Sequence, residues 1–278
     1  MIYNKIKKMK LTNLILILFI FSLTPIVPPK VIKPYKGIIV PAYFYDESLW
    51  QKIINTKYSL NYFIIANVNN GPGKIVDLNY KKWISILNKS GKRILGYVYS
   101  SYTKRDINLV KKDIESWIKL YPEIKGFFID EVSDSKDKKE FYYYSEIYKY
   151  IKNINRSFYV ILNPGNFDIN LELLKFSDSI VVFEDDYKEF NKVELPLWLK
   201  EFSQNKFISI VYNVPKNEVL NVYQFLKDKG VGIVYITDDK LPNPYDSLPS
   251  YYNLLIKIIY LPTSIIPIPP IPPPNVKE

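Results

Sequence analysis

The stretch GFFIDE, Gly126–Glu131, decides the fold that this sequence predicts. A glycine and three large apolar side chains lead directly into two adjacent carboxylates, which is typical of a buried strand that ends at a polar edge. Other short apolar runs rich in Val, Ile, Phe and Tyr resemble it. The eight predicted strands are Gly37–Phe44, Tyr62–Val68, Ile94–Tyr99, Gly126–Ile129, Phe158–Leu162, Ile180–Phe183, Phe207–Tyr212 and Gly232–Ile236.

Amphipathic stretches lie between these runs. They predict helices over Tyr80–Asn88, Ile107–Leu120, Tyr143–Ile154 and Leu220–Lys229. Near-continuous apolar strands that alternate with helices indicate a parallel sheet with both faces covered. Eight such units between residues 36 and 260 predict an α/β fold of the TIM-like (β/α)8 barrel type. A doubly wound open sheet is the alternative, although no glycine-rich dinucleotide-binding motif is present.

The composition excludes several kinds of chemistry. The 278 residues contain no Cys and no His, so disulfides, thiolate catalysis, Ser-His-Asp triads and His-ligated metals are impossible. Proton transfer must then use Asp, Glu, Lys or Tyr with shifted pKa values. The net charge is +10, but Lys is interspersed with Asp and Glu and no nucleic-acid-binding motif is present. We therefore expect no nucleic-acid partner, no metal and no cofactor.

In a (β/α)8 barrel the functional residues lie at the carboxyl ends of the strands. Asp130 and Glu131 end one apolar run, and Glu184 ends another two strands later. Glycoside hydrolysis uses such a pair of carboxylates, one to protonate the leaving oxygen and one as nucleophile or base. Helix capping is the competing explanation for acids at strand ends. The acids that capping fits best are Asp134, Asp185 and Asp186.

Other polar and aromatic residues near the predicted strand ends are candidates for substrate binding. Tyrosine suits this role because sugar rings combine apolar C–H faces with hydroxyl edges. The chain has 25 Tyr, so a packing role competes at each of them. The candidates are Tyr43, Tyr45, Asn69, Tyr97, Tyr99, Arg105, Asn163, Tyr212 and Asp238.

Both ends of the chain differ from its middle. Met1–Lys10 is basic and Leu14–Leu23 is almost entirely apolar, which is typical of a secretory signal. We expect a signal peptide or uncleaved membrane anchor over 1–24, a proline-rich linker over 25–35, and a disordered or extended proline-rich tail over 261–278. The expectation is a secreted or cell-surface monomer whose only membrane contact is the N-terminal segment.

Several stretches between Ile38 and Leu255 carry a further signal. In order they are PAYFYD with Trp50, NNGPG, GYVYSSYTKRD, IESWIKLYPEIKGFFIDEVS, LNPG, SDSIVVFED and ITDDKLPNPYDSLPSYY. With these stretches in this order, the chain resembles the spherulin-4 family. The resemblance implies a (β/α)8 glycoside hydrolase related to the endo-α-1,4-galactosaminidases.

The resemblance also implies roles for individual residues. Asp130 would be the nucleophile or base, Glu184 the general acid, and Glu131 a residue that orients or tunes them. Relatives often carry His at the end of the seventh strand, where Tyr212 stands here. This departure weakens the transfer of substrate specificity more than the transfer of reaction type.

These observations together predict an exported glycoside hydrolase that cleaves an amino-sugar, galactosaminoglycan-like polysaccharide. The alternative is a catalytically inactive cell-surface protein that binds a glycan or a partner on the same barrel. A protein of net charge +10 would not be drawn to a cationic, deacetylated polymer, which favours an N-acetylated or anionic substrate.

Overall fold

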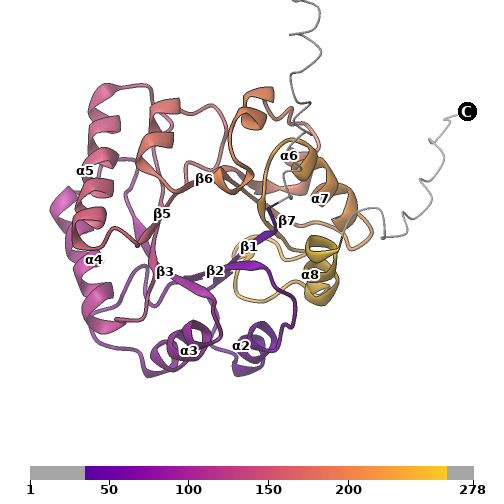
Figure 1. The fold of residues 1–278 in the computed structure, drawn as a ribbon, viewed down its shortest axis with the longest axis horizontal. Helices are drawn as coiled ribbons and strands as arrows, with labels where there is room; N and C mark the ends of the chain where they lie inside the picture. Colours follow the sequence, from indigo (N-terminus) through magenta and orange to yellow (C-terminus); the bar gives the residue numbers. More distant parts are fainter. Residues whose placement is uncertain (1–34, 262–278) are drawn as a thin grey trace, which may run out of the picture. The chain divides into compact units, whose positions relative to one another are not determined.

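The computed structural model describes residues 35–261 and shows a closed barrel of eight parallel strands (Figure 1). Each strand pairs with the next along the chain, and β1 pairs with β8 to close the ring. The barrel prediction is confirmed, and the open sheet is excluded. The strands are β1 (Gly37–Ala42), β2 (Asn61–Ala66), β3 (Arg93–Tyr99), β4 (Gly126–Asp130), β5 (Tyr159–Leu162), β6 (Ser179–Asp186), β7 (Phe207–Tyr212) and β8 (Ile233–Ile236).

Helices surround the strands, as Figure 1 shows. Those of the described residues are α2 (Glu47–Ile54), α3 (Leu78–Lys89), α4 (Ile107–Leu120), α5 (Lys138–Ile154), α6 (Tyr187–Phe190), α7 (Val219–Asp228) and α8 (Tyr252–Tyr260). Short 3₁₀ helices occur as η1 (Leu171–Phe176), η2 (Leu197–Glu201) and η3 (Gln204–Lys206). Asp side chains cap five of the helices by accepting from backbone N–H groups of the first turn, which satisfies donors that the helix leaves free. These caps are Asp46, Asp77, Asp106, Asp137 and Asp186.

Two glycines explain how tightly β3 and β4 pack. A Cβ on Gly126, where φ is +155°, would lie 1.9 Å from the carbonyl oxygen of Tyr159 on β5. A Cβ on Gly96 would lie 2.7 Å from the Trp117 ring of α4, which also donates its indole N–H to the Tyr97 carbonyl. Glycine at both positions lets neighbouring chain approach more closely than any side chain permits. The start of β4 is therefore set by the glycine of GFFIDE.

A β-bulge in β6 sets the direction of its last residues. The pairing of β6 with β7 runs from Val181 opposite Ile208 to Phe183 opposite Ser209, so Val182 is an extra residue. A bulge shifts the alternation of side chains by one position, and so it decides which side Glu184 faces. The strand continues to Asp186, three residues beyond its predicted end, because pairing with β7 extends that far.

The predicted signal or anchor and almost all of the linker and tail lie outside residues 35–261, which the structure describes. Within the described part of the chain, no helix has the length and apolar character that crossing a membrane requires.

Candidate active site

Two carboxylates meet on one amide at the carboxyl end of the barrel. Asp130 is the last residue of β4, Glu184 lies near the end of β6, and Asn163 directly follows β5 between them. The Asn163 Nδ2 atom donates to Asp130 Oδ1 at 2.7 Å and to Glu184 Oε2 at 2.6 Å. The structure therefore brings together two of the three predicted catalytic residues, with a predicted substrate-binding residue as the bridge.

Backbone hydrogen bonds hold this bridge in place. The Asn163 N–H donates to the Ile129 carbonyl at 2.8 Å, and the Asn163 carbonyl accepts from the Val132 N–H at 3.0 Å. The Glu184 N–H donates to the Gly165 carbonyl at 2.9 Å. Backbone pairing with neighbouring strands thus fixes the positions of the Asn163 and Glu184 main chains. Rigid strands of this kind hold the side chains of a barrel site in a defined geometry.

The surroundings of the two carboxyl groups affect their pKa values differently. Burial raises the pKa of Glu184 to about 7, and the charge of Asp130 adds to this rise. Burial also raises the pKa of Asp130, but hydrogen bonds from Tyr97, the Glu131 backbone and Asn163 oppose that rise. Both side chains keep partial contact with solvent. In such a pair Asp130 ionises first, and its charge then helps to retain the proton on Glu184.

Tyrosines surround the pair. The Tyr97 hydroxyl donates to Asp130 Oδ2 at 2.7 Å, and the Tyr245 hydroxyl donates to Glu184 Oε1. The Tyr43 ring packs edge-on against both, with ring centroids 5.9 Å from Tyr97 and 5.7 Å from Tyr245. Two predicted substrate-binding residues, Tyr43 and Tyr97, therefore lie in the immediate surroundings of the carboxylates.

Tyr245 is the site residue that sequence reasoning missed. It lies in the segment between β8 and α8, 61 residues after Glu184. Its backbone carbonyl also accepts from the Tyr43 N–H at 3.3 Å, which ties this segment to the end of β1. The sequence marks it only by its position in the stretch that follows the last strand. Because the chain has 25 Tyr, that position alone does not distinguish it from the others.

Glu131 follows Asp130 in a strained conformation. Its φ is +53°, a left-handed value that residues other than glycine seldom adopt. Its carbonyl accepts from the Tyr102 N–H at 2.7 Å and from the Ser100 hydroxyl at 2.8 Å. These contacts hold the chain in a sharp turn directly after β4, and the Glu131 side chain is partly exposed.

Three predicted residues lie one layer further out. The Tyr212 hydroxyl donates to Asp185 Oδ1 at 3.1 Å rather than to the central pair. Arg105 forms an ion pair with Asp113 at 2.6 Å and lies 4.0 Å from the centroid of the Tyr99 ring. Arg105 and Tyr99 therefore order the segment after β3, while Tyr212 contacts an acid that follows Glu184.

The remaining three predicted residues have local partners. The Tyr45 hydroxyl donates to Asp77 at 3.1 Å, and its side chain is exposed. Asn69 is exposed in a turn whose geometry comes from Asn67, since the Asn67 side chain accepts from the Gly71 N–H. Asp238 accepts from the backbone N–H and hydroxyl of Ser250. The structure shows no contact between these three and the carboxylate pair.

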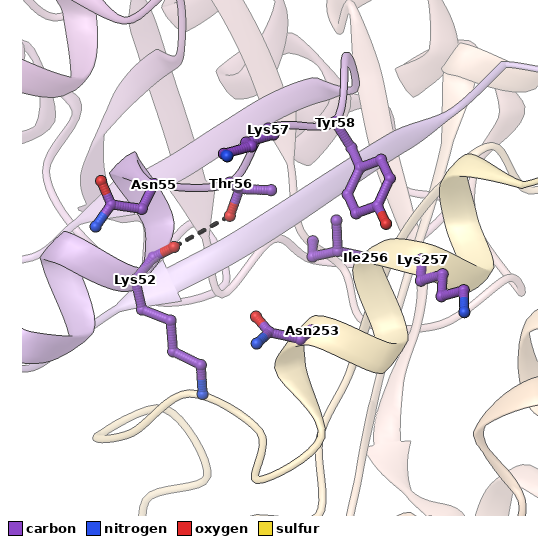
Figure 2. Close-up of a pocket in the computed structure, with 8 residues that line it drawn as sticks. All are labelled: Lys52, Asn55, Thr56, Lys57, Tyr58, Asn253, Ile256 and Lys257. Atoms are coloured by element: carbon purple, nitrogen blue, oxygen red, sulfur yellow. Dashed lines mark hydrogen bonds between the residues drawn. The ribbon is translucent and has the colours of Figure 1, made fainter.

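A hollow of about 570 Å³ lies elsewhere, between α2, the segment that enters β2, and α8 (Figure 2). Lys52, Lys57 and Lys257 line it together with uncharged residues, and none of the predicted site residues is among them. Among residues 35–261, no three acidic side chains form a group able to hold a metal ion.

The family of this chain follows from comparison with known sequences. The model of spherulation-specific family 4 matches residues 37–259. Spherulin-4 of Physarum polycephalum is 30% identical over 227 residues, which cover 78% of this chain and 68% of that protein. The chain belongs to the spherulin-4 family. The resemblance stated from the sequence is thus confirmed, and the match covers the whole barrel.

Solved structures share the barrel. Sph3 of Aspergillus clavatus, solved in complex with GalNAc, superposes with a TM-score of 0.73 at 23% identity, covering 82% of this spherulin-4 family member and 98% of Sph3. A chitinase of Chromobacterium violaceum superposes with a TM-score of 0.54 at 9% identity, covering 81% of this chain and 98% of the chitinase. These similarities establish the fold that the strand pairing already showed.

Proposed function

We propose that this spherulin-4 family member is a glycoside hydrolase that cleaves an amino-sugar polysaccharide with Asp130 and Glu184. The observation that carries the proposal is the pair of carboxyls with separated pKa values on one bridging amide. Glycoside hydrolysis needs one carboxyl that is protonated and another that is ionised at the same pH. Glu184 and Asp130 meet that requirement near neutral pH.

The spacing of the carboxyls supports retention of anomeric configuration. Because Asp130 Oδ1 and Glu184 Oε2 bind the same nitrogen, at 2.7 and 2.6 Å, these oxygens are at most about 5.3 Å apart. Retaining enzymes hold their two carboxyls about 5–5.5 Å apart, whereas inverting enzymes leave room for a water at about 6.5–9.5 Å.

In the proposed reaction Glu184 donates its proton to the glycosidic oxygen while Asp130 attacks the anomeric carbon. The bond from that carbon to the leaving oxygen breaks, and a covalent glycosyl ester forms on Asp130. Glu184, now ionised, takes a proton from water, which attacks the same carbon and releases Asp130. Tyr97 and Tyr245 orient the two carboxyls.

The choice of an amino sugar rests on similarity. Sph3, which shares the fold, was solved with GalNAc bound, and the second structural relative is named a chitinase. Three aromatic side chains, those of Tyr43, Tyr97 and Tyr245, stand beside the carboxylates, and such rings suit the C–H faces of a sugar. A galactosamine-containing polymer is therefore the first substrate to test.

A reducing-end assay on N-acetylgalactosamine oligomers tests the reaction. Asp130→Asn and Glu184→Gln should each lower kcat by about 10²–10⁴-fold, since each removes an acid, base or nucleophile. Asp168→Asn is the matched control, because Asp168 is an exposed acid at the same end of the barrel that pairs with Lys136. Full activity in Asp130→Asn would contradict the mechanism. Binding without turnover in the unmodified protein would favour the inactive glycan-binding alternative.

We also propose that the protein is exported and acts as a monomer. The basic and apolar segments of residues 1–24 support export, and residues of one chain form the whole carboxylate site. Fractionation of cells expressing the full chain tests the location, and recovery in the cytosol with residues 1–24 intact would contradict export.

A further inference from the structure

The end of the barrel opposite the carboxylate pair is basic. The segments that enter the strands carry eight Lys or Arg and two acids; they are 35–36, 55–60, 90–93, 121–125, 155–158, 177–178, 203–206 and 229–232. The segments at the carboxyl ends of the strands carry fifteen Asp or Glu and six Lys or Arg; they are 43–46, 67–77, 100–106, 130–137, 163–170, 184–186, 213–218 and 237–251. All eight strands run in the same direction, so the two sets of segments lie at opposite ends.

Two hollows at this amino end are lined by bases and by no acid. The hollow of Figure 2 lies where the chain enters β2, and Lys52, Lys57 and Lys257 line it. A second hollow, of about 380 Å³, lies where the chain enters β3, β4 and β5. Its basic lining residues are Lys92, Arg93 and Lys125. A concave surface with positive charge on its walls fits a small anionic group such as a phosphate ester.

The three lysines of the Figure 2 hollow keep their charge unpaired. Among residues 35–261, none of the ion pairs involves Lys52, Lys57 or Lys257. Lys57 and Lys257 are exposed, and the Lys52 ammonium lies 5.7 Å from the centroid of the Tyr252 ring. Like charges held around one hollow repel each other, and an anion between them would replace that repulsion with attraction.

Two exposed tyrosines accompany these lysines. Tyr58 lines the Figure 2 hollow, and its ring centroid lies 4.8 Å from that of Tyr260. The exposed fractions of the two residues are 37% and 36%. The Lys36 ammonium lies 5.1 Å from the centroid of the Tyr260 ring and donates to the Tyr260 carbonyl. Tyrosine and lysine with an apolar body and a polar tip are the side chains that suit a membrane–water interface.

Both ends of the described chain leave the barrel at this basic end. Tyr35 directly precedes the segment that enters β1, and Leu261 follows α8. Residues 1–24 are the expected signal or anchor, and the ten residues 25–34 that join them to the barrel span at most about 36 Å. When residues 1–24 are held in a bilayer, a connection of that length keeps the amino end of the barrel near the membrane at a high effective concentration.

We propose that the amino end of this barrel docks on a bilayer that contains anionic phospholipid, with lipid phosphates seated in the two basic hollows. Each Lys or Arg near an anionic membrane surface tightens binding by about fivefold. Docking adds a surface of the barrel to the membrane contact expected of the N-terminal segment alone. It also points the carboxylate pair away from the membrane, because Asp130 and Glu184 lie at the opposite ends of their strands.

A single fluorophore tests the orientation, because the chain has no Cys and one introduced Cys is labelled alone. The full chain is mixed with vesicles that carry a quencher on the lipid headgroups, made of phosphatidylcholine alone or of an equal mixture with phosphatidylglycerol. The fluorophore on Asn55→Cys, beside the Figure 2 hollow, should be quenched at least about threefold more by the anionic vesicles at about 0.01 M salt. The excess should vanish at about 1 M salt, where the Debye length shrinks from about 30 to about 3 Å. The fluorophore on Asp168→Cys, an exposed position at the carboxyl end, should show no excess.

Charge variants test the residues. K52Q/K57Q/K257Q should lower the docking equilibrium constant, taken from the quenched fraction of Asn55→Cys, by at least about tenfold. K74Q/K104Q/K240Q removes the same charge from exposed lysines at the carboxyl end and should leave that constant within about twofold. Equal quenching by the two kinds of vesicle would overturn the inference, as would an equal loss in both triple variants. A larger response of the Asn55→Cys fluorophore to soluble polyphosphate than to anionic vesicles would assign this end to a soluble polyanion and would also overturn it.

Discussion

Replacing Glu184 by Gln should stabilise this protein at alkaline pH and leave its stability almost unchanged near pH 4. The pKa of Glu184 is about 7 in the folded protein, compared with an ordinary value of 4.5. The folded state therefore binds this proton more tightly than the unfolded state does. As the pH rises through the range from 4.5 to 7, the unfolded chain releases the proton first, so folding becomes progressively less favourable.

The magnitude follows from the size of the shift. Each pKa unit corresponds to about 1.4 kcal/mol, so the full cost above pH 7 is about 3 kcal/mol. Gln keeps the shape of the side chain without the charge. Its carbonyl can accept from Asn163, and its amide can donate to the Tyr245 oxygen, whose own proton then loses the acceptor that Glu184 provided. The substitution should therefore remove most of the cost of the buried charge while it keeps contact with both Asn163 and Tyr245.

Urea denaturation at pH 4 and at pH 8.5 measures the effect. We expect the free energy of unfolding of Glu184→Gln to exceed that of the unmodified protein by about 3 kcal/mol at pH 8.5 and by a few tenths at pH 4. Asp168→Asn is the control, since exposed ion pairs contribute little at any pH. An equal difference at both pH values would refute the reasoning, because the carboxyl would then ionise alike in the folded and unfolded states.

Three further predictions concern the site and the fold. Hydrolysis should decline above about pH 7 as Glu184 loses its proton, and a rate that stays constant to pH 9 would exclude Glu184 as the acid. Tyr97→Phe should move the acidic limb of the pH–rate profile upward, because Asp130 loses a donor that favours its charged form; an unmoved limb would contradict this. Gly126→Ala should lower the free energy of unfolding, measured by denaturation, by more than about 3 kcal/mol. Gly91→Ala, with open space for its Cβ, should lower it by about 1–2 kcal/mol. Equal losses would show that the contact with Tyr159 is not decisive.

The sequence determined the fold class and the end of the barrel at which the candidate site lies. Apolar runs such as GFFIDE must be buried, and the helices between them must cover the sheet, so their alternation predicts a parallel barrel. In a parallel barrel every strand delivers its last residue to the same end, which is why Asp130 and Glu184 could be selected from their positions alone. The absence of His and Cys directed attention to these carboxylates.

Only the tertiary structure decided which side chains touch. Asn163 was a candidate by position, but its bridge between β4 and β6 depends on the bulge at Val182 and on backbone pairing with neighbouring strands. Tyr245 reaches Glu184 across 61 residues of chain, a contact that no local pattern encodes. The separation of acidic and basic residues is likewise a property of the closed barrel. Charges that alternate along the chain are sorted to opposite ends because each strand runs in the same direction.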